Sequence, residues 1–306
     1  MNSSVQIIVL NWNGYTDTSE LLDSLKKIKT PEINLIVIDN NSSGNDVAHL
    51  EYNYKDYILL LKSDSNLGFA GGNNIGIKKA LEYDPDYILL INNDTIVTPN
   101  FLSMLLDKFN VDKKIGIVAP QINYYDEPKK VWSAGGRISK IRGSGFAISN
   151  KLENEITLTD RYVDFVSGCC MLIKKEVFQN VGLFDEKYFL YTEDTDFCYR
   201  VVKAGYKIYI TSASKIFHKV NNSTKEILFS LPLYYTTRNR LYFSKKNFND
   251  IFTLTFIYIS TVMIVKSIFW LTSGKVNQVK VIIQAFKDFF GNKMGKIHNS
   301  KLFEYK

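Results

Sequence analysis

Cysteine is scarce in this sequence, which has three cysteines among 306 residues. Cys169 and Cys170 are adjacent and Cys198 stands alone, so their spacing fits neither a disulfide framework nor a zinc site. Chains without structural disulfides are typical of reducing compartments. We therefore expect a cytoplasmic location.

We expect no secretion signal, and no internal repeat or low-complexity segment is visible in the sequence. Residues 1–6 carry no basic run, and the apolar stretch at residues 7–10 is too short for a signal core. Apolar residues at 45% and charged residues at 23% are ordinary for a globular protein. The length allows one large domain with an appendage, or two domains.

Excess basic charge is missing from most of the chain. Residues 244–306 contain ten lysines and three acidic residues, which gives this segment a net charge of +7, equal to that of the whole chain. A protein that binds nucleic acid usually spreads lysine and arginine over its main domain. We therefore expect no nucleic-acid partner, and a C-terminal region that is attracted to an anionic membrane surface.

Apolar runs alternate with amphipathic segments in the first half of the chain. Strand-like runs cover residues 5–11, 33–40, 57–63 and 86–94, and helical spacing covers 19–28, 73–83 and 99–109. This alternation favours an α/β fold with a mainly parallel sheet flanked by helices. Such sheets bind ligands at the carboxyl ends of their strands. The polar residues at those ends are Asn11, Asn13, Asp39, Asn66, Asn92, Asn93 and Asp94.

Two interpretations of the segment Asn92–Asn93–Asp94 stay open on the residues alone. Carboxylate and amide oxygens at a sheet edge can hold a divalent cation against a diphosphate. An Asx turn between a strand and a helix explains the same residues equally well. His218 ends a later strand-like run, and a lone histidine in that position is more often structural than a ligand.

Residues 65–76 are rich in glycine but lack the G-x-G-x-x-G spacing of dinucleotide-binding folds. Gly71 and Gly72 would let the backbone approach a ligand closely, and Asn73 and Asn74 could cap the helix that we expect to follow. The amide groups at that helix start would be donors for an anion.

Acidic residues crowd the segment from Glu193 to Asp196. An ordinary helix start explains them, with Thr192 as N-cap and Asp196 paired with Arg200 four residues later. In a helix, Asp194 points about 200° away from Asp196, so Asp194 can face a cleft. Spacing alone favours the helix start over a metal cage or a proton-accepting site.

A largely apolar run over residues 251–271, interrupted by Lys266, is long enough to span a bilayer. The lysine lies toward the end of the run, where its side chain could reach the interface. Association with the membrane interface is the favoured interpretation. A spanning helix and a helix buried against the main domain are the alternatives.

Several segments together resemble the inverting family-2 glycosyltransferases of the GT-A fold, in particular their bacterial rhamnosyltransferase-like branch. The matching segments are "IVLNWNG" (8–14), "VIDNNSS" (37–43), "NLGFAGGNN" (66–74), "LLINNDT" (89–95), the stretch 168–206 and "YYTTRNRLYF" (234–243). The resemblance implies a Rossmann-like sheet flanked by helices. It covers residues 5–243, in order.

The resemblance also implies roles for individual residues. Asp94 and His218 would hold Mg²⁺ or Mn²⁺, with Asn92 at a position where many members have aspartate. Asp194 would be the general base that activates the acceptor, with Glu193 as its coupled neighbour. Asp39 would contact a pyrimidine base. The other residues placed near the nucleotide sugar are Asn11, Asn13, Asn66, Gly71, Gly72, Asn73 and Asn93.

Together, these features predict a metal-dependent glycosyltransferase peripheral to the inner face of the cell membrane. It would move rhamnose or a similar sugar, with inversion, from a dTDP- or UDP-sugar to a glycan or polyprenyl-linked acceptor in cell-surface polysaccharide synthesis. A nucleotidyltransferase is an alternative, although "VLNWNGYT" lacks the basic residues that it would need. The other alternative is a non-catalytic sugar- or lipid-binding subunit. We expect a catalytic domain over 1–225 and a helical, basic and apolar region over 226–306.

Overall fold

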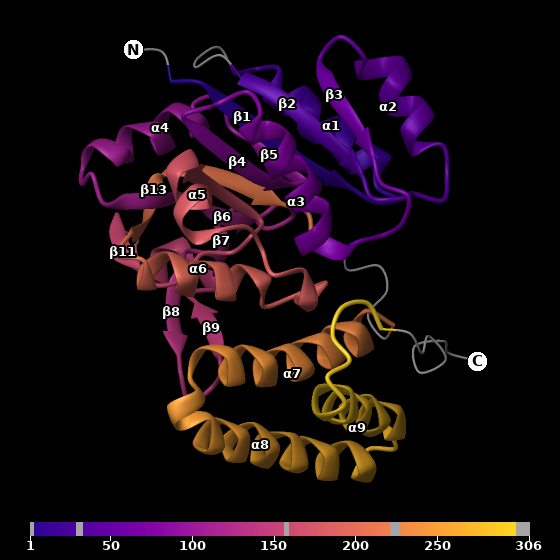
Figure 1. The fold of residues 1–306 in the computed structure, drawn as a ribbon. Helices are drawn as coiled ribbons and strands as arrows, with labels where there is room; N and C mark the ends of the chain where they lie inside the picture. Colours follow the sequence, from indigo (N-terminus) through magenta and orange to yellow (C-terminus); the bar gives the residue numbers. More distant parts are fainter. Residues whose placement is uncertain (1–2, 29–32, 156–158, 221–226, 298–306) are drawn as a thin grey trace.

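The computed structural model describes residues 3–28, 33–155, 159–220 and 227–297. Its strands form a twisted sheet with helices packed against it (Figure 1). The strands are β1 (Val5–Asn11), β2 (Ile33–Asp39), β3 (Ile58–Lys62), β4 (Tyr87–Asn92), β5 (Thr95–Val97), β6 (Ile115–Tyr124), β7 (Lys130–Ser133), β8 (Gly136–Ser139), β9 (Ser144–Ala147), β10 (Lys151–Leu152), β11 (Arg161–Val163), β12 (Cys170–Lys174) and β13 (Lys207–His218).

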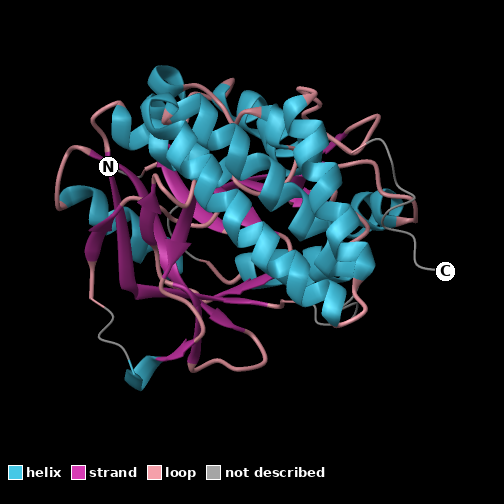
Figure 2. Cartoon of the chain, turned by 90° about the horizontal axis from the view of Figure 1, so that it is seen from below, coloured by secondary structure: helices cyan, strands magenta, loops and turns pink. Residues whose placement is uncertain are grey.

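The helices separate into two groups. Those of the first group accompany the sheet, and those of the second follow it in sequence and pack on one another beneath it (Figures 1 and 2). The first group comprises α1 (Tyr15–Leu25), α2 (Asp46–Tyr54), α3 (Gly68–Leu81), α4 (Phe101–Asp107), α5 (Lys175–Val181) and α6 (Glu193–Lys203). The second comprises α7 (Ile227–Asn247), α8 (Phe252–Thr272) and α9 (Val276–Phe290).

The sheet is parallel in its first half and mixed in its second. β1 pairs in parallel with both β2 and β4, and β2 pairs in parallel with β3. β12 then runs antiparallel between β4 and β6. The register sets Asn11 opposite Asp39 and Leu10 opposite Asn92. The polar ends of β1, β2 and β4 therefore meet at one edge, as the α/β prediction requires, and the core strands are buried on both faces.

Helix α3 starts five residues earlier than the sequence predicts. It begins at Gly68, so the glycine-rich stretch is the first turn of the helix and not a loop before it. A Cβ at Gly72 would lie 2.4 Å from Cδ1 of Leu10, and one at Gly76 would lie 2.6 Å from the side chain of Ile8. The glycines therefore let α3 pack closely on β1. This packing is information that a local pattern does not contain.

Gly68→Ala should be among the most destabilising single changes in the chain. Gly68 has a φ of +71°, and an added Cβ would lie 2.1 Å from the carbonyl oxygen of Phe189. Strain and overlap together should cost roughly 4 kcal/mol or more. Gly182→Ala is the control, because Gly182 has a φ of +82° with nothing near its Cβ position, and it should cost about 1–2 kcal/mol. Equal losses in urea denaturation would contradict the packing argument.

Helix α8 presents apolar side chains outward. The continuous helical stretch Asn249–Thr272, with a hydropathy of 1.8, is long and apolar enough to cross a membrane by length and composition, and 17% of its most apolar 18-residue window is buried. Ile264 and Phe269 are 60% and 64% exposed. The alternative of a helix buried against the main domain is therefore wrong for most of its surface. The predicted boundary at 225/226 lies outside the described residues.

Candidate active site

A cavity of about 510 Å³ opens at the polar edge of the sheet. Its walls come from five parts of the chain: the ends of β1, β2 and β4, the start of α3, the loop before α6, helix α7, and the segment after α9. The lining residues from the sheet edge and α3 are Leu10, Trp12, Asn40, Asn41, Asn66, Gly68, Phe69, Asn92, Asn93 and Asp94, and those from the later parts are Phe189, Leu190, Leu231, Tyr235, Lys296 and Ile297.

Asp94 and His218 face each other at this edge. The short strand β5 pairs with the end of β13, which sets His218 opposite Thr95. His218 Nε2 lies 3.0 Å from Oδ1 and 3.1 Å from Oδ2 of Asp94, and only the contact to Oδ2 has hydrogen-bond geometry. Among the described residues, Oδ1 of Asp94 and Nδ1 of His218 are thus buried without hydrogen-bond partners. Buried polar atoms without partners are costly, and a bound cation would satisfy the free carboxylate oxygen.

The donor set at this edge suits a divalent cation that is completed by its substrate. Carboxylate oxygen and imidazole nitrogen are ligands of Mn²⁺, and Mg²⁺ takes the carboxylate. Within the described residues no group of three or more His, Cys, Asp or Glu side chains could hold a metal, so the remaining ligands would come from a bound diphosphate. The adjacent Asn92 also faces the cavity, while Thr95 Oγ1 donates to its carbonyl and fixes the turn. The turn and the cation site are therefore compatible.

Asn11 and Asp39 belong to a buried cluster of hydrogen-bonded side chains and do not line the cavity. Asn11 is fully buried and Asp39 is 3% exposed. Asn11 Nδ2 donates to Asp39, Ser42 and Asp46, and Asp39 accepts two further hydrogen bonds from Ser42. Asn13 accepts from the backbone N–H of the residue after Ser42. These side chains hold the loops after β1 and β2 together.

The residues that line the cavity at the ends of β1 and β2 are sequence neighbours of the predicted residues. Trp12 lies between Asn11 and Asn13 and is 55% exposed. Asn40 and Asn41 follow Asp39 and line the cavity. Because side chains alternate along an extended chain, the residue next to a buried polar side chain points the other way. This alternation is the feature of the sequence that could have predicted Trp12 as the residue facing the cavity.

The predicted residues in and before α3 divide in the same way. Asn66 lines the cavity and accepts hydrogen bonds from Asn40 and from the N–H of Gly68. Gly71, Gly72 and Asn73 lie inside α3 and are buried against the core, so they do not line the cavity. Asn73 donates to the carbonyl of Phe69 and does not cap a helix start. Asn93 lines the cavity and donates to Thr18.

The acids at the start of α6 separate into a desolvated pair and a structural residue. Glu193 is 5% exposed and its Oε2 has no hydrogen-bond partner. Asp194 accepts hydrogen bonds from the N–H groups of Gly168 (3.1 Å) and Thr195 (2.7 Å). Burial raises the pKa of Asp194, with those hydrogen bonds opposing the rise, and burial next to Asp194 raises the pKa of Glu193 well above its usual value. Such desolvated carboxyl pairs are typical of sites that move protons.

Asp194 and Glu193 are not among the residues that line the cavity. Gly168 connects Asp194 to the cavity wall: its N–H donates to Asp194, and a Cβ placed on it would lie 3.5 Å from the Cβ of Asp194 and 2.9 Å from the ring of Phe69. Phe69 itself lines the cavity. Asp194 and Phe69 therefore lie on the same glycine, with Phe69 toward the cavity.

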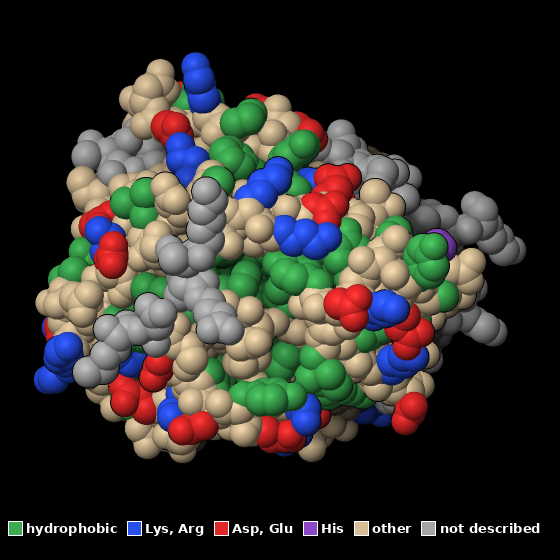
Figure 3. Space-filling model, turned by 90° about the horizontal axis from the view of Figure 1, so that it is seen from above, with side chains coloured by type: hydrophobic (Ala, Val, Ile, Leu, Met, Phe, Trp, Pro, Cys, Tyr) green, Lys and Arg blue, Asp and Glu red, His purple; other side chains and the backbone are tan. Residues whose placement is uncertain are grey.

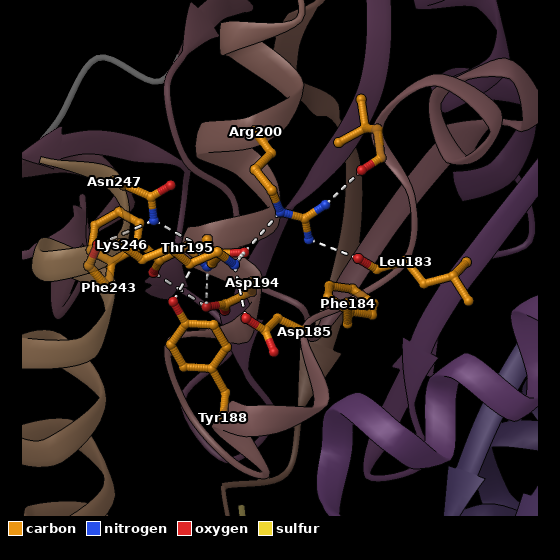
Figure 4. A network of polar contacts seen from close by, with 12 residues as sticks. Leu183, Phe184, Asp185, Tyr188, Asp194, Thr195, Arg200, Phe243, Lys246 and Asn247 are labelled. Atoms are coloured by element: carbon orange, nitrogen blue, oxygen red, sulfur yellow. Dashed lines mark hydrogen bonds and ion pairs between the residues drawn. The ribbon is translucent and has the colours of Figure 1, made fainter. Parts of the chain in front are cut away.

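Asp196 has the structural role that its spacing predicts. It is fully buried, and Arg200 donates to it at 2.8 Å. Lys246 and Asn247 at the end of α7 also donate to it, as does the hydroxyl of Tyr188. Figure 4 shows Arg200, Lys246, Asn247 and Tyr188 gathered in one polar network. The network ties α6 to α7. Thr192 precedes the helix as expected, but its side chain makes no capping hydrogen bond.

The loop before α6 is held in an unusual conformation by α7. Phe189, Tyr191 and Thr192 all have positive φ angles, between 62° and 78°. Asn239 Nδ2 donates to three carbonyls of this loop, those of residues 188, 190 and 191, at 2.8–3.0 Å. Positive φ in bulky residues costs energy and persists where the surroundings enforce it. The segment "TTRNR" (236–240) thus helps to fix the loop that precedes Glu193 and Asp194. Its sequence alone does not indicate this role.

Glu193→Gln should stabilise the protein at neutral and alkaline pH. Because the folded-state pKa of Glu193 is raised, the native state binds the proton more tightly than the unfolded state, and stability falls as pH rises through the interval between the usual and the raised pKa. Removing the unpartnered charge should add about 1–3 kcal/mol to the free energy of unfolding above that interval and little below it. Urea denaturation at several pH values measures the effect, with Glu82→Gln in an exposed pair as control. A pH-independent difference would contradict the assignment.

Comparison with known proteins identifies the family of this chain. A family model described as "Glycosyltransferase like family 2" matches residues 3–240. The chain is 24% identical over 247 residues to an N-acetylglucosaminyl-diphospho-decaprenol L-rhamnosyltransferase of Mycobacterium tuberculosis, covering 74% of this chain and 80% of the relative. It is 28% identical over 235 residues to a rhamnosyltransferase of Escherichia coli, covering 72% of this chain and 85% of the relative.

Solved structures show the same fold. A mannosyltransferase of Pyrobaculum calidifontis, solved with GDP-Man and Mn²⁺, superposes with a TM-score of 0.60 at 12% identity and covers 96% of this chain and 88% of that one. The mixed sheet with parallel core strands is thus the GT-A fold. The protein belongs to the family-2 glycosyltransferases.

Proposed function

We propose that this glycosyltransferase moves rhamnose or a similar sugar, with inversion, from a dTDP- or UDP-sugar to a glycan or polyprenyl-linked acceptor in cell-surface polysaccharide synthesis. The observation that carries the proposal is Asp94, which lines the cavity and contacts the buried imidazole of His218, together with the Asp194 carboxylate, which Gly168 holds near the cavity-lining Phe69. Relatives named as rhamnosyltransferases support the choice of sugar.

The sheet edge would bind the nucleotide. Trp12 offers an exposed aromatic face for the base, and the exposed Asn41 offers an amide group at the same cavity. Asp94 and His218 would hold Mg²⁺ or Mn²⁺ against the diphosphate. When bound, the cation would offset the negative charge of the departing nucleoside diphosphate.

Asp194 would act as the general base. The acceptor hydroxyl attacks the anomeric carbon from the face opposite the diphosphate, a new carbon–oxygen bond forms, and the bond to the diphosphate oxygen breaks. The hydroxyl proton passes to the Asp194 carboxylate, whose raised pKa makes it a better acceptor than an ordinary aspartate. The N–H groups of Gly168 and Thr195 hold the carboxylate in place.

The charge and shape of the surface fit this assignment. Acidic and basic side chains are interspersed on the face seen in Figure 3, which does not favour a nucleic-acid partner. The exposed apolar side of α8, next to lysines in α8 and α9, fits peripheral attachment to an anionic membrane from the cytoplasmic side.

The proposed function is tested by incubating the full chain with dTDP-rhamnose or UDP-sugars, with Mn²⁺, and measuring nucleoside diphosphate release and sugar transfer to an N-acetylglucosaminyl diphospholipid. Inverted transfer product is the expected result. A nucleotidyltransferase would instead consume a nucleoside triphosphate with a sugar phosphate and release pyrophosphate. A non-catalytic subunit would show a thermal shift with the sugar nucleotide but no turnover.

Membrane attachment should depend on the outward face of α8. Ile264→Asp combined with Ile268→Asp should weaken binding to phosphatidylglycerol vesicles at least about tenfold, since each charge must leave the apolar interface. Val111→Asp is the control, because Val111 is 56% exposed on the catalytic domain. Vesicle flotation measures the binding. Unchanged flotation of the double variant would exclude α8 as the attachment surface.

A further inference from the structure

The segment that follows α9 turns back toward the cavity. Figure 1 shows this segment, coloured yellow, rising from α9 alongside α7. The N–H of Gly295 donates to the carbonyl of Lys187, and the N–H of Ile297 donates to the hydroxyl of Tyr235. Lys296, between them, lines the cavity together with Ile297.

A buried arginine fixes the backbone of this segment. Arg238 is 1% exposed, and its Nη1 donates to the carbonyls of Lys293 (3.3 Å) and Gly295 (2.9 Å). The same nitrogen donates to the hydroxyl of Tyr234, which donates in turn to Asp288 in α9. The backbone is therefore held on both sides of Lys296, and the position of that side chain at the cavity is a consequence of the fold.

Lys296 is the cation of the cavity wall. Among the described lining residues the charged side chains are Asp94 and Lys296. Within residues 3–28, 33–155, 159–220 and 227–297, no carboxylate lies within 4.0 Å of its ammonium group, and the residue is exposed. An unpaired lysine held at a polar cavity can bind a phosphate group.

We propose that Lys296 binds the diphosphate of the sugar-nucleotide donor, so that the segment after α9 completes the donor site. The inference rests on the proposed function and extends it. A cation at Asp94 neutralises part of the diphosphate charge, and the lysine ammonium would neutralise more as that group departs. The donor site thus includes residues beyond 240, where the family model ends.

The test is calorimetric binding of dTDP, UDP and GDP, each with Mn²⁺, to the full chain and to Lys296→Met. For whichever of the three nucleoside diphosphates binds the wild type, the affinity of Lys296→Met should be about 10- to 100-fold lower, as expected for loss of a charge-assisted contact. Binding of the corresponding nucleoside should not change. Lys296→Arg should recover most of the affinity, and raised salt should reduce the difference between the wild type and Lys296→Met.

Lys293→Met is the matched control, because Lys293 is an exposed lysine of the same segment that does not line the cavity. Its affinity should equal that of the wild type, and both methionine variants should melt at the wild-type temperature. Wild-type affinity in Lys296→Met would overturn the inference alone. Failure of the wild type to bind any of the three nucleoside diphosphates would overturn the proposed function as well.

Discussion

Asp194→Asn should lower the rate of sugar transfer about 10²- to 10⁴-fold while the affinity for the nucleotide sugar stays unchanged. The amide cannot accept the acceptor's proton, yet it keeps the size of the carboxylate. Nδ2 of the asparagine would face one of the two N–H donors that now reach Asp194, which should lower the melting temperature slightly. Single-turnover transfer and calorimetric donor binding separate the two effects.

The pH dependence of turnover is an independent test of Asp194 as the general base. Because burial raises the pKa of Asp194, wild-type turnover should fall as pH is lowered through that raised value, where the carboxylate becomes protonated. The residual activity of Asp194→Asn should lack this dependence. Asp196→Asn is the control, since Asp196 binds Arg200 and Lys246: it should lose stability and keep the wild-type profile. Full transfer activity in folded Asp194→Asn would rule out the base assignment.

Asp94→Asn should abolish the Mn²⁺-dependent part of donor binding and lower transfer about 10²-fold or more. Asp94 provides the carboxylate at the cavity, and its Oδ1 has no hydrogen-bond partner in the part of the chain that the structure describes. The measurement is a thermal-shift titration with nucleoside diphosphate, with Mn²⁺ or EDTA. The wild type should show a larger shift with Mn²⁺ than with EDTA, and the variant should show the same shift in both.

Asn92→Asp is the opposing variant, since Asn92 lines the same cavity two residues before Asp94. A second carboxylate there should tighten Mn²⁺ binding, so that half-maximal activation occurs at a lower metal concentration. Undiminished transfer by the wild type in EDTA would show that the pair Asp94–His218 does not hold an essential metal.

Much of the fold follows from local patterns. Strands β1 to β4 are continuous apolar runs bounded by polar residues, so their positions could be read directly from the sequence. The separation of Asp194 from Asp196 on α6 also follows from helical geometry, because Asp196 and Arg200 are four residues apart. The apolar character of α8 was visible in its composition, whereas its exposure was not, because a buried helix has the same composition.

The tertiary structure decided which polar residues face the cavity. Asn11 and Asp39 are adjacent only through strand pairing, and their side chains hydrogen-bond to each other and to Ser42. Trp12, in contrast, has an exposed side chain that can contact a ligand. Gly72 is a packing residue because Leu10 lies against it.

The sequence by itself determined the α/β class, the strand ends and the acids that could carry the chemistry, because each depends on residues within a few positions of one another. The tertiary structure placed His218 beside Asp94, 124 residues earlier, a pairing that the family resemblance implied but that no local pattern contains. It alone brought Lys296 to the cavity that Asp94 lines. It also set Asn239 under the loop before α6. These contacts join distant segments whose meeting depends on the packing of the whole chain, and no local pattern encodes that packing.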